Sequence, residues 1–159
     1  MKVIKLAVIS FVFVFIMATL FSLMVPSHLR ISKAVNVAAD QDSIFSLINN
    51  KSNWPRWHPA FQQGKSVDEV LATNKIIITP LIKTDSLVTM QWKQADKRPV
   101  VNGWQLHHLP SSDSLALQWY MDFDLQWYPW QKFGSLFYEN IYGSMMEKGL
   151  TNIKSTVQQ

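Results

Sequence analysis

Apolar and polar side chains alternate along Leu115–Trp127, and every odd position of this stretch is apolar. Successive side chains on a β-strand point to opposite faces, so the alternation predicts a strand with one dry face and one wet face. At about 3.4 Å per residue the strand would reach roughly 40 Å, which exceeds the usual strand length. Because strands of this length twist, we expect it to curl around a partner.

A helical pattern follows Pro129 and runs from about Trp130 to Thr156. Apolar residues recur along it at Phe133, Phe137, Ile141 and Met145, and the stripe continues through Leu136, Met146, Leu150, Ile153 and Val157. A helix of roughly 26 residues would be about 39 Å long, which matches the reach of the strand. We therefore expect the odd face of the strand to meet this helix.

The segments ahead of the long strand predict a first strand, short helices and a meander. Leu29–Val37 alternates, and Asp40 can cap a short helix whose apolar face holds Ile44 and Phe45. Further strands are predicted at Lys75–Thr79, Leu87–Gln94 and Val100–Leu109, with Pro80 marking an edge or a bulge. The pattern of residues 62–71 favours no element.

Leu6–Val25 is an uncharged apolar run that ends just before Pro26. A helix of this length spans about 30 Å, the thickness of a bilayer core. A cleaved signal peptide is the alternative, but its apolar region is usually shorter and is followed by small residues at the cleavage site. We therefore predict a transmembrane anchor over residues 1–27 and a folded domain over residues 28–159.

The charges that flank the apolar run indicate its orientation. Lys2 and Lys5 lie on one side, while Arg30 and Lys33 lie close on the other. The positive-inside rule favours a cytoplasmic N-terminus. We expect a single-pass protein of the cell membrane with its domain on the extracytoplasmic side.

Composition removes several classes of function. The absence of cysteine excludes disulfides and thiolate metal sites. The net charge is +4, two of the 15 basic residues precede the apolar run, and no basic cluster occurs, so we expect no nucleic-acid partner. The histidines and carboxylates lack metal-ligand spacing, and no glycine-rich phosphate loop is present. We therefore expect neither a metal nor another cofactor.

Two short parts of the chain resemble a known family. The first is a strand ending in Ala39, followed by the pair Ile44–Phe45 and by a Trp-x-x-Trp-x-Pro motif, Trp54–Pro59. The second is Met146–Lys154, where a Gly-Leu pair precedes an aliphatic-Lys pair. They are similar to the opening and the last helix of the START-like helix-grip superfamily, also called SRPBCC or polyketide cyclase/dehydrase-like. The resemblance covers about residues 29–159.

This resemblance implies an α+β helix-grip fold, in which a curved antiparallel sheet wraps around a long C-terminal helix. It also implies a cavity between sheet and helix, which holds lipids, sterols, polyketides or other apolar ligands in various members. Many bacterial members begin with one membrane helix, and the superfamily shares no catalytic set. Two departures stand out: Asp40 replaces a common Pro, and residues 65–110 have a single glycine, Gly103, where relatives are often Gly-rich.

The ionisable residues do not form a recognisable catalytic set. His107 and His108 are adjacent on a predicted strand and face opposite sides, so only His108 shares a face with Trp104. Asp122 and Asp124 share the polar face of the long strand, which we expect to be exposed because the apolar face meets the helix. We assign no catalytic residue, and an enzyme is the less favoured class.

The 7 Trp and 9 Phe residues favour an aromatic core or an apolar cavity. Our candidates for the cavity wall are Trp92, Trp104, His108, Trp119, Met121, Phe123, Phe137 and Ile141. We expect a hydrophobic small molecule or lipid to bind there, since ligand pockets are mainly apolar with a few polar groups. The alternatives are a cyclase- or hydrolase-like enzyme, with His108 or Tyr120 in the same cavity, and a non-catalytic interaction module whose cavity is filled.

Overall fold

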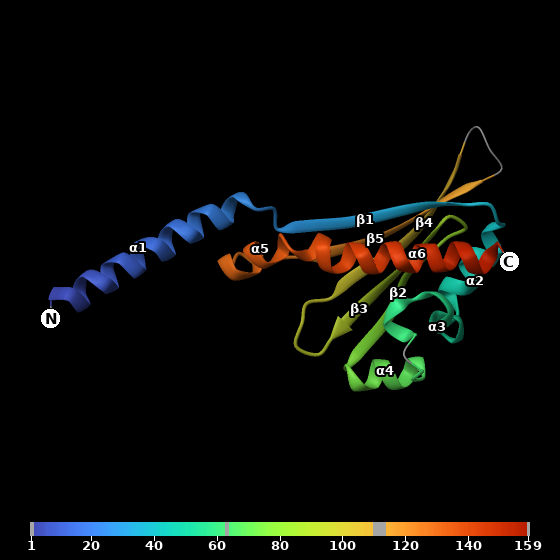
Figure 1. Ribbon diagram of the computed structural model, residues 1–159, viewed down its shortest axis with the longest axis horizontal. Helices are drawn as coiled ribbons and strands as arrows, with labels where there is room; N and C mark the ends of the chain where they lie inside the picture. The colour runs from blue at the N-terminus through green and yellow to red at the C-terminus, as the bar shows by residue number, and fades with distance from the viewer. Residues whose placement is uncertain (1, 63, 110–113, 159) are drawn as a thin grey trace.

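The computed structural model describes residues 2–62, 64–109 and 114–158, and Figure 1 shows their arrangement. Helix α1 (Lys2–Met24) projects away from the folded domain, and nearly all of its side chains are exposed. Strand β1 (His28–Val37) begins directly after it. The predicted apolar helix and first strand are therefore both present.

Short helices follow β1. They are α2 (Gln41–Asn49), the 3₁₀ turn η1 (Lys51–Asn53), α3 (Trp54–Trp57), the 3₁₀ turn η2 (Pro59–Phe61) and α4 (Val67–Thr73). The predicted cap of α2 is confirmed: the Asp40 carboxylate accepts a hydrogen bond of 2.8 Å from the backbone N–H of Ser43, which lowers the pKa of Asp40. Helix α4 occupies much of residues 62–71, where the sequence pattern favoured no element. Its own cap, from the Glu69 N–H to the Ser66 hydroxyl, belongs to a Ser-x-x-Glu pattern that could have located it.

Five strands of the described residues form one antiparallel sheet in the order β1-β5-β4-β3-β2. The strands after β1 are β2 (Ile76–Lys83), β3 (Leu87–Gln94), β4 (Val100–His108) and β5 (Leu115–Asp124). The pairing register shifts between Pro80 and Ile82 on the edge strand β2, because proline has no N–H to donate to the ladder. Strand β5 ends before the predicted Trp127, because Asp124 already pairs with His28, the first residue of β1.

The predicted C-terminal helix from about Trp130 to Thr156 is present as a long helical segment, but it is interrupted. Helix α5 (Pro129–Ser135) ends in a turn, the π-helical segment η3 (Glu139–Gly143) follows, and α6 (Ser144–Val157) completes the chain. Lys33 of β1 lies 2.7 Å from the Glu139 carboxylate and 2.8 Å from that of Glu147, and these bonds raise the pKa of Lys33. The wide π turn thus brings two carboxylates to one cation on the sheet.

The helix-grip architecture is nevertheless the one that the sequence predicts. Helix α6 contacts β1, β5, α2 and α3, and its apolar residues Met146, Leu150 and Ile153 are buried. On β5 the odd positions, such as Leu117, face this helix and are buried. The curved antiparallel sheet therefore wraps one face around the C-terminal helical segment, and Figure 1 shows α6 running alongside β1 and β5.

Candidate functional site

One end of the space between sheet and helix is filled with aromatic rings. Trp57 meets both Trp104 and Trp119 edge to face, at centroid distances of 6.1 and 5.7 Å, and these two indoles stack on each other at 5.5 Å. All three are at most 1% exposed. Gly149 of α6 lets the helix approach, since a Cβ there would lie 2.7 Å from Trp119 Cζ3. We call this cluster, together with Trp54, His58 and Phe61, the aromatic box.

His58 is a buried structural residue of the aromatic box. Its ring lies 4.9 Å from that of Phe61 and 5.3 Å from that of Trp119, and only 2% of its surface is exposed. Burial lowers the pKa of His58 to about 3, so the imidazole is neutral near pH 7. The neutral Nδ1 accepts a hydrogen bond of 3.2 Å from the Ala60 N–H and caps the turn η2. A histidine that shuttles protons needs contact with solvent and a pKa nearer 7, and buried His58 has neither.

The other end of the grip is open. A small cavity of about 130 Å³, which we call the inner hollow, lies between the sheet and η3. It is lined by Ile76, Trp92, Gln94, Lys97, Arg98, Val100, Asn102, Met121 and Tyr142. A wider groove of about 570 Å³, the outer groove, shares Lys97, Arg98, Val100 and Tyr142 with it and adds Phe123 and Tyr138. The two spaces are therefore adjacent; the inner hollow is mainly apolar, whereas the outer groove is lined by polar and apolar residues in similar proportion.

Two residues that line the inner hollow each carry a buried N–H donor with no acceptor among the described residues. These donors are the indole Nε1 of Trp92 and the amide Nδ2 of Asn102. The orientation of Asn102 is fixed, because its Oδ1 accepts a bond of 3.1 Å from Trp119 Nε1, and an indole nitrogen can only donate. Leaving a buried donor unmatched costs about 1–3 kcal/mol, so either donor would be stabilised by an acceptor that reached it. The Trp104 indole, a third such donor, does not line the inner hollow.

Two cations stand at the shared wall of the two spaces. Lys97 and Arg98 come from the turn between β3 and β4, and both are exposed. The outer rim also carries the carboxylates of Asp96 and Asp124, of which Asp124 is bound by His28 at 2.7 Å. On the inner side, burial raises the pKa of Tyr142, which keeps its phenol neutral. The site thus combines an apolar floor, two residues with neutral donors, and a mouth where Lys97 and Arg98 lie near Asp96 and Asp124.

The opposite face of the sheet carries a ladder of cross-strand pairs. Arg30 donates two hydrogen bonds, of 2.6 and 2.7 Å, to the Asp122 carboxylate, and this contact raises the pKa of the guanidinium. The same guanidinium lies 4.2 Å from the Tyr120 ring centroid. Tyr120 in turn packs over Gly103, where a Cβ would lie 2.1 Å from its ring. These contacts therefore hold Asp122 and Tyr120 on the face of the sheet opposite α6, as the alternation of β5 predicted for Asp122.

The eight residues predicted from the sequence for a cavity wall do not come together. Trp92, Met121 and Phe123 line the inner hollow or the outer groove. Trp104 and Trp119 are sealed inside the aromatic box.

The other three candidates, His108, Phe137 and Ile141, lie on the surface and need correction. His108 is exposed at the end of β4, where it pairs with Leu115, the first residue of β5. Phe137 and Ile141 are 62% and 59% exposed, because the turn after α5 and the π segment rotate them away from the sheet. We do not retain these three as cavity residues. The proposed enzyme alternative also loses its candidates, since neither His108 nor Tyr120 lines the hollow.

The sequence interpretation missed Asn102, Tyr142, Lys97 and Arg98. Asn102 carried a usable signal, because it is a lone polar residue on the buried face of a strand between Val100 and Trp104. Such a residue needs a partner. Tyr142 could not be assigned, because its position depends on the π-helical turn.

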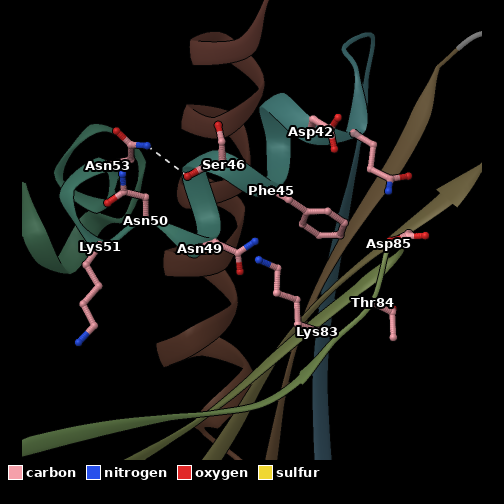
Figure 2. Close-up of a pocket in the computed structure, with 11 residues that line it drawn as sticks. Asp42, Phe45, Ser46, Asn49, Asn50, Lys51, Asn53, Lys83, Thr84 and Asp85 are labelled. Atoms are coloured by element: carbon pink, nitrogen blue, oxygen red, sulfur yellow. Dashed lines mark hydrogen bonds between the residues drawn. The ribbon is translucent and has the colours of Figure 1, made fainter.

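A larger hollow of about 760 Å³ lies elsewhere, between α2 and the turn that joins β2 to β3. Figure 2 shows its wall, where Lys83, Thr84 and Asp85 face Asn49 and Phe45 across an open groove. Its wall is mainly polar, and Phe45 is 7% exposed. Among the described residues no group of three histidines or carboxylates could hold a metal ion.

No protein-family description matches the chain, and no curated protein matches it. Solved structures do match the chain. A START superfamily protein from Mycobacterium smegmatis matches with a TM-score of 0.55 and 19% identity, over 82% of this chain and 97% of that one. The fold is START-like. The chain is also similar to an uncharacterized protein from Bacillus thuringiensis, with a TM-score of 0.55 and 12% identity over 82% of this chain and 100% of that one. The di-domain ARO/CYC BexL matches with a TM-score of 0.58 and 11% identity, over 82% of this chain and 46% of that one.

Helix α1 stands outside the START-like domain. It has 23 residues, a mean hydropathy of 2.6 over its most apolar window, and 6% of that window is buried. By length and composition it can cross a membrane, and a signal sequence can meet the same criteria.

Proposed function

We propose that this protein binds an amphiphilic molecule with an apolar body and an anionic or carbonyl-bearing head, in the inner hollow and outer groove of a membrane-anchored START-like domain. Residues 1–27 form the anchor and residues 28–159 the binding domain. The observation that carries the proposal is the mainly apolar inner hollow beside Lys97 and Arg98, whose lining residues Trp92 and Asn102 each carry an unmatched N–H donor. An oxygen acceptor on the ligand would satisfy the donors, and a negative charge would meet the cations.

The apolar body of the ligand would lie against Trp92, Met121, Phe123 and the Tyr142 ring. These side chains come from β3, β5 and η3, so both layers of the grip hold the ligand. The aromatic box would limit how deep the ligand can reach, because the stacked, buried rings of Trp119 and Trp104 lie next to Asn102, to which Trp119 donates a hydrogen bond. Part of the ligand therefore lies in the outer groove, which suits a molecule that enters from a neighbouring bilayer.

The test is native mass spectrometry of the full chain released from detergent micelles. Dodecanoate serves as the anionic probe and dodecyltrimethylammonium as the matched cationic one. We expect retained dodecanoate and little retained cation. Arg98→Gln and Trp92→Phe should each reduce retention of dodecanoate, since one removes a charge and the other removes a donor while keeping a ring. Lys148→Gln, on the exposed side of α6, is the control and should retain it fully. Equal retention of both probes, or of dodecanoate by all four proteins, would refute the proposal.

The proposed extracytoplasmic orientation has a separate test. The chain has no cysteine, so Lys148→Cys creates a single thiol on an exposed helix face. A maleimide that cannot cross membranes should label this thiol in intact cells. Labelling only after the cells are broken would place the domain in the cytoplasm.

A further inference from the structure

Helix α5 buries polar side chains and exposes aromatic ones, which is the reverse of a helix on a water-exposed surface. Its buried side chains include Lys132 and Ser135, which are 2% and 5% exposed. Its outward side chains are Trp130 and Phe133, 63% and 39% exposed, and the adjoining turn adds Leu136 at 63%. A helix in water turns its charged residues outward and its aromatic residues inward. The arrangement of α5 is the one expected where the surroundings are less polar than the contact with the protein.

Lys132 is buried because it binds the end of α1. Its ammonium donates to the Val25 carbonyl at 2.6 Å and to the Ser27 hydroxyl at 2.8 Å. The carbonyls at the C-terminus of a helix have no partner within the helix and attract cations. Ser22 of α1 adds a contact of 3.5 Å to the Trp127 carbonyl, and its side chain is fully buried. These bonds fix α5 beside the point where α1 ends, and Figure 1 shows the two together at that end of the domain.

Three rings lie next to that junction. Trp127 and Trp130 are 58% and 63% exposed, and Tyr128 lies between them in the sequence. The rings of Tyr128 and Trp130 stack at 4.8 Å, and that of Trp127 lies 4.9 Å from Tyr128. Trp and Tyr gather at the boundary between lipid and water, where an apolar ring with a polar N–H or O–H is most stable. We call Trp127, Tyr128, Trp130 and Phe133 the aromatic tip.

We infer that the aromatic tip inserts into the interfacial layer of the bilayer that α1 crosses, so that the domain is docked on the membrane. The inference rests on the proposed anchoring by α1 and adds a second membrane contact to it. Lipid is the occupant that the observations favour, because the tip is continuous with the exposed apolar surface of α1 and has the residue types of an interface. A docked domain would keep the outer groove close to the lipid surface.

The test uses single-cysteine variants of the full chain, each carrying a nitroxide, in nanodiscs of phosphatidylcholine and phosphatidylglycerol. Val14→Cys reports the middle of α1, Trp130→Cys and Phe133→Cys report the tip, and Lys148→Cys reports the distant face of α6. Accessibility to oxygen, which concentrates in lipid, is compared with accessibility to a water-soluble nickel complex. We expect the ratio at 130 and 133 to shift from the value at 148 towards that at 14.

The outcomes separate this inference from the anchor on which it rests. If position 14 is in lipid while 130 and 133 match 148, the anchor stands and the tip does not insert. If position 14 also matches 148, the anchor itself is refuted. If 130 and 133 are shielded from both reagents, another protein surface or a second copy covers the tip, and the lipid assignment is wrong.

Discussion

Helices α5 and α6 belong to the same C-terminal segment but present opposite surfaces to the domain. Helix α6 buries Met146, Leu150 and Ile153 and exposes Glu147 and Lys148, as a helix over a protein core should. Helix α5 buries Lys132 and exposes Trp130. The difference lies in what each helix packs on: α6 meets a dry sheet, whereas α5 meets the polar end of α1. The same hydrophobic stripe can therefore serve as a core face in one turn and as an outer face in another.

The largest expected difference comes from matched leucine truncations in α6 and in the turn that follows α5. Leu150 is 2% exposed, so Leu150→Ala should lower the free energy of unfolding by about 2–5 kcal/mol. Leu136 is 63% exposed, so Leu136→Ala should change it by no more than about 0.5 kcal/mol. Urea unfolding of the full chain in detergent micelles, followed by near-ultraviolet circular dichroism, measures both. Comparable losses would show that Leu136 also belongs to a packed core.

Acid should destabilise the aromatic box through His58. The ordinary histidine pKa is about 6.5, and burial lowers that of His58 to about 3. The unfolded chain therefore gains a proton at a pH where the native chain does not. The contribution of neutral His58 to the free energy of unfolding is fully present above about pH 6.5. It falls as the pH drops towards 3, by up to about 1.4 kcal/mol per pH unit.

The control for His58 is a residue that keeps the cap but does not titrate. His58→Asn retains an acceptor for the Ala60 N–H, so its stability curve should be flatter between about pH 6.5 and 3. Unfolding midpoints across this range give the slope for each protein. An unchanged slope in the variant would assign the acid sensitivity to other groups.

Removing the buried ammonium should loosen α1 from the domain. Lys132→Met leaves the Val25 carbonyl and the Ser27 hydroxyl without their partner, at a cost of about 1–3 kcal/mol. We expect a broader distance distribution between nitroxides at Val14→Cys and Thr151→Cys, measured by pulsed electron paramagnetic resonance in nanodiscs. Lys148→Met is the control and should leave the distribution narrow. A narrow distribution in both proteins would mean that Lys132 does not position α1.

The smallest effects separate two glycines. Gly149→Ala would place a Cβ 2.7 Å from a Trp119 carbon in the aromatic box, and such overpacking costs about 1–3 kcal/mol. A Cβ at Gly134 of α5 meets no atom of the described residues within 4 Å, so Gly134→Ala should be neutral or should stabilise the helix by up to about 1 kcal/mol. Thermal unfolding of the two variants in parallel measures the contrast. A stabilised Gly149→Ala protein would contradict the close approach of α6 to Trp119.

Several features of the fold were predictable because they depend on neighbours in the sequence. The alternation in Leu115–Trp127 predicted which face of β5 is dry, and it also predicted that Asp122 lies on the other face. The Asp40 cap and the disturbance at Pro80 follow from the local chemistry of a carboxylate and of a missing N–H. The length and composition of Leu6–Val25 likewise determine that α1 is an apolar helix long enough to cross a membrane.

The candidate site depended on packing between distant elements. Trp92 and Trp119 have the same residue type and lie on dry strand faces, but only Trp92 lines the inner hollow, because Trp57 and Gly149 close the space around Trp119. Periodicity likewise could not separate Phe137 from Met146, since the π-helical turn between them rotates one outward and leaves the other buried. The sequence by itself thus determined the elements and their dry faces, which follow from side-chain alternation and helical period. Only the tertiary structure decided which rings fill the grip, which donors remain unmatched and which apolar residues face outward, because those depend on contacts between residues far apart in the chain.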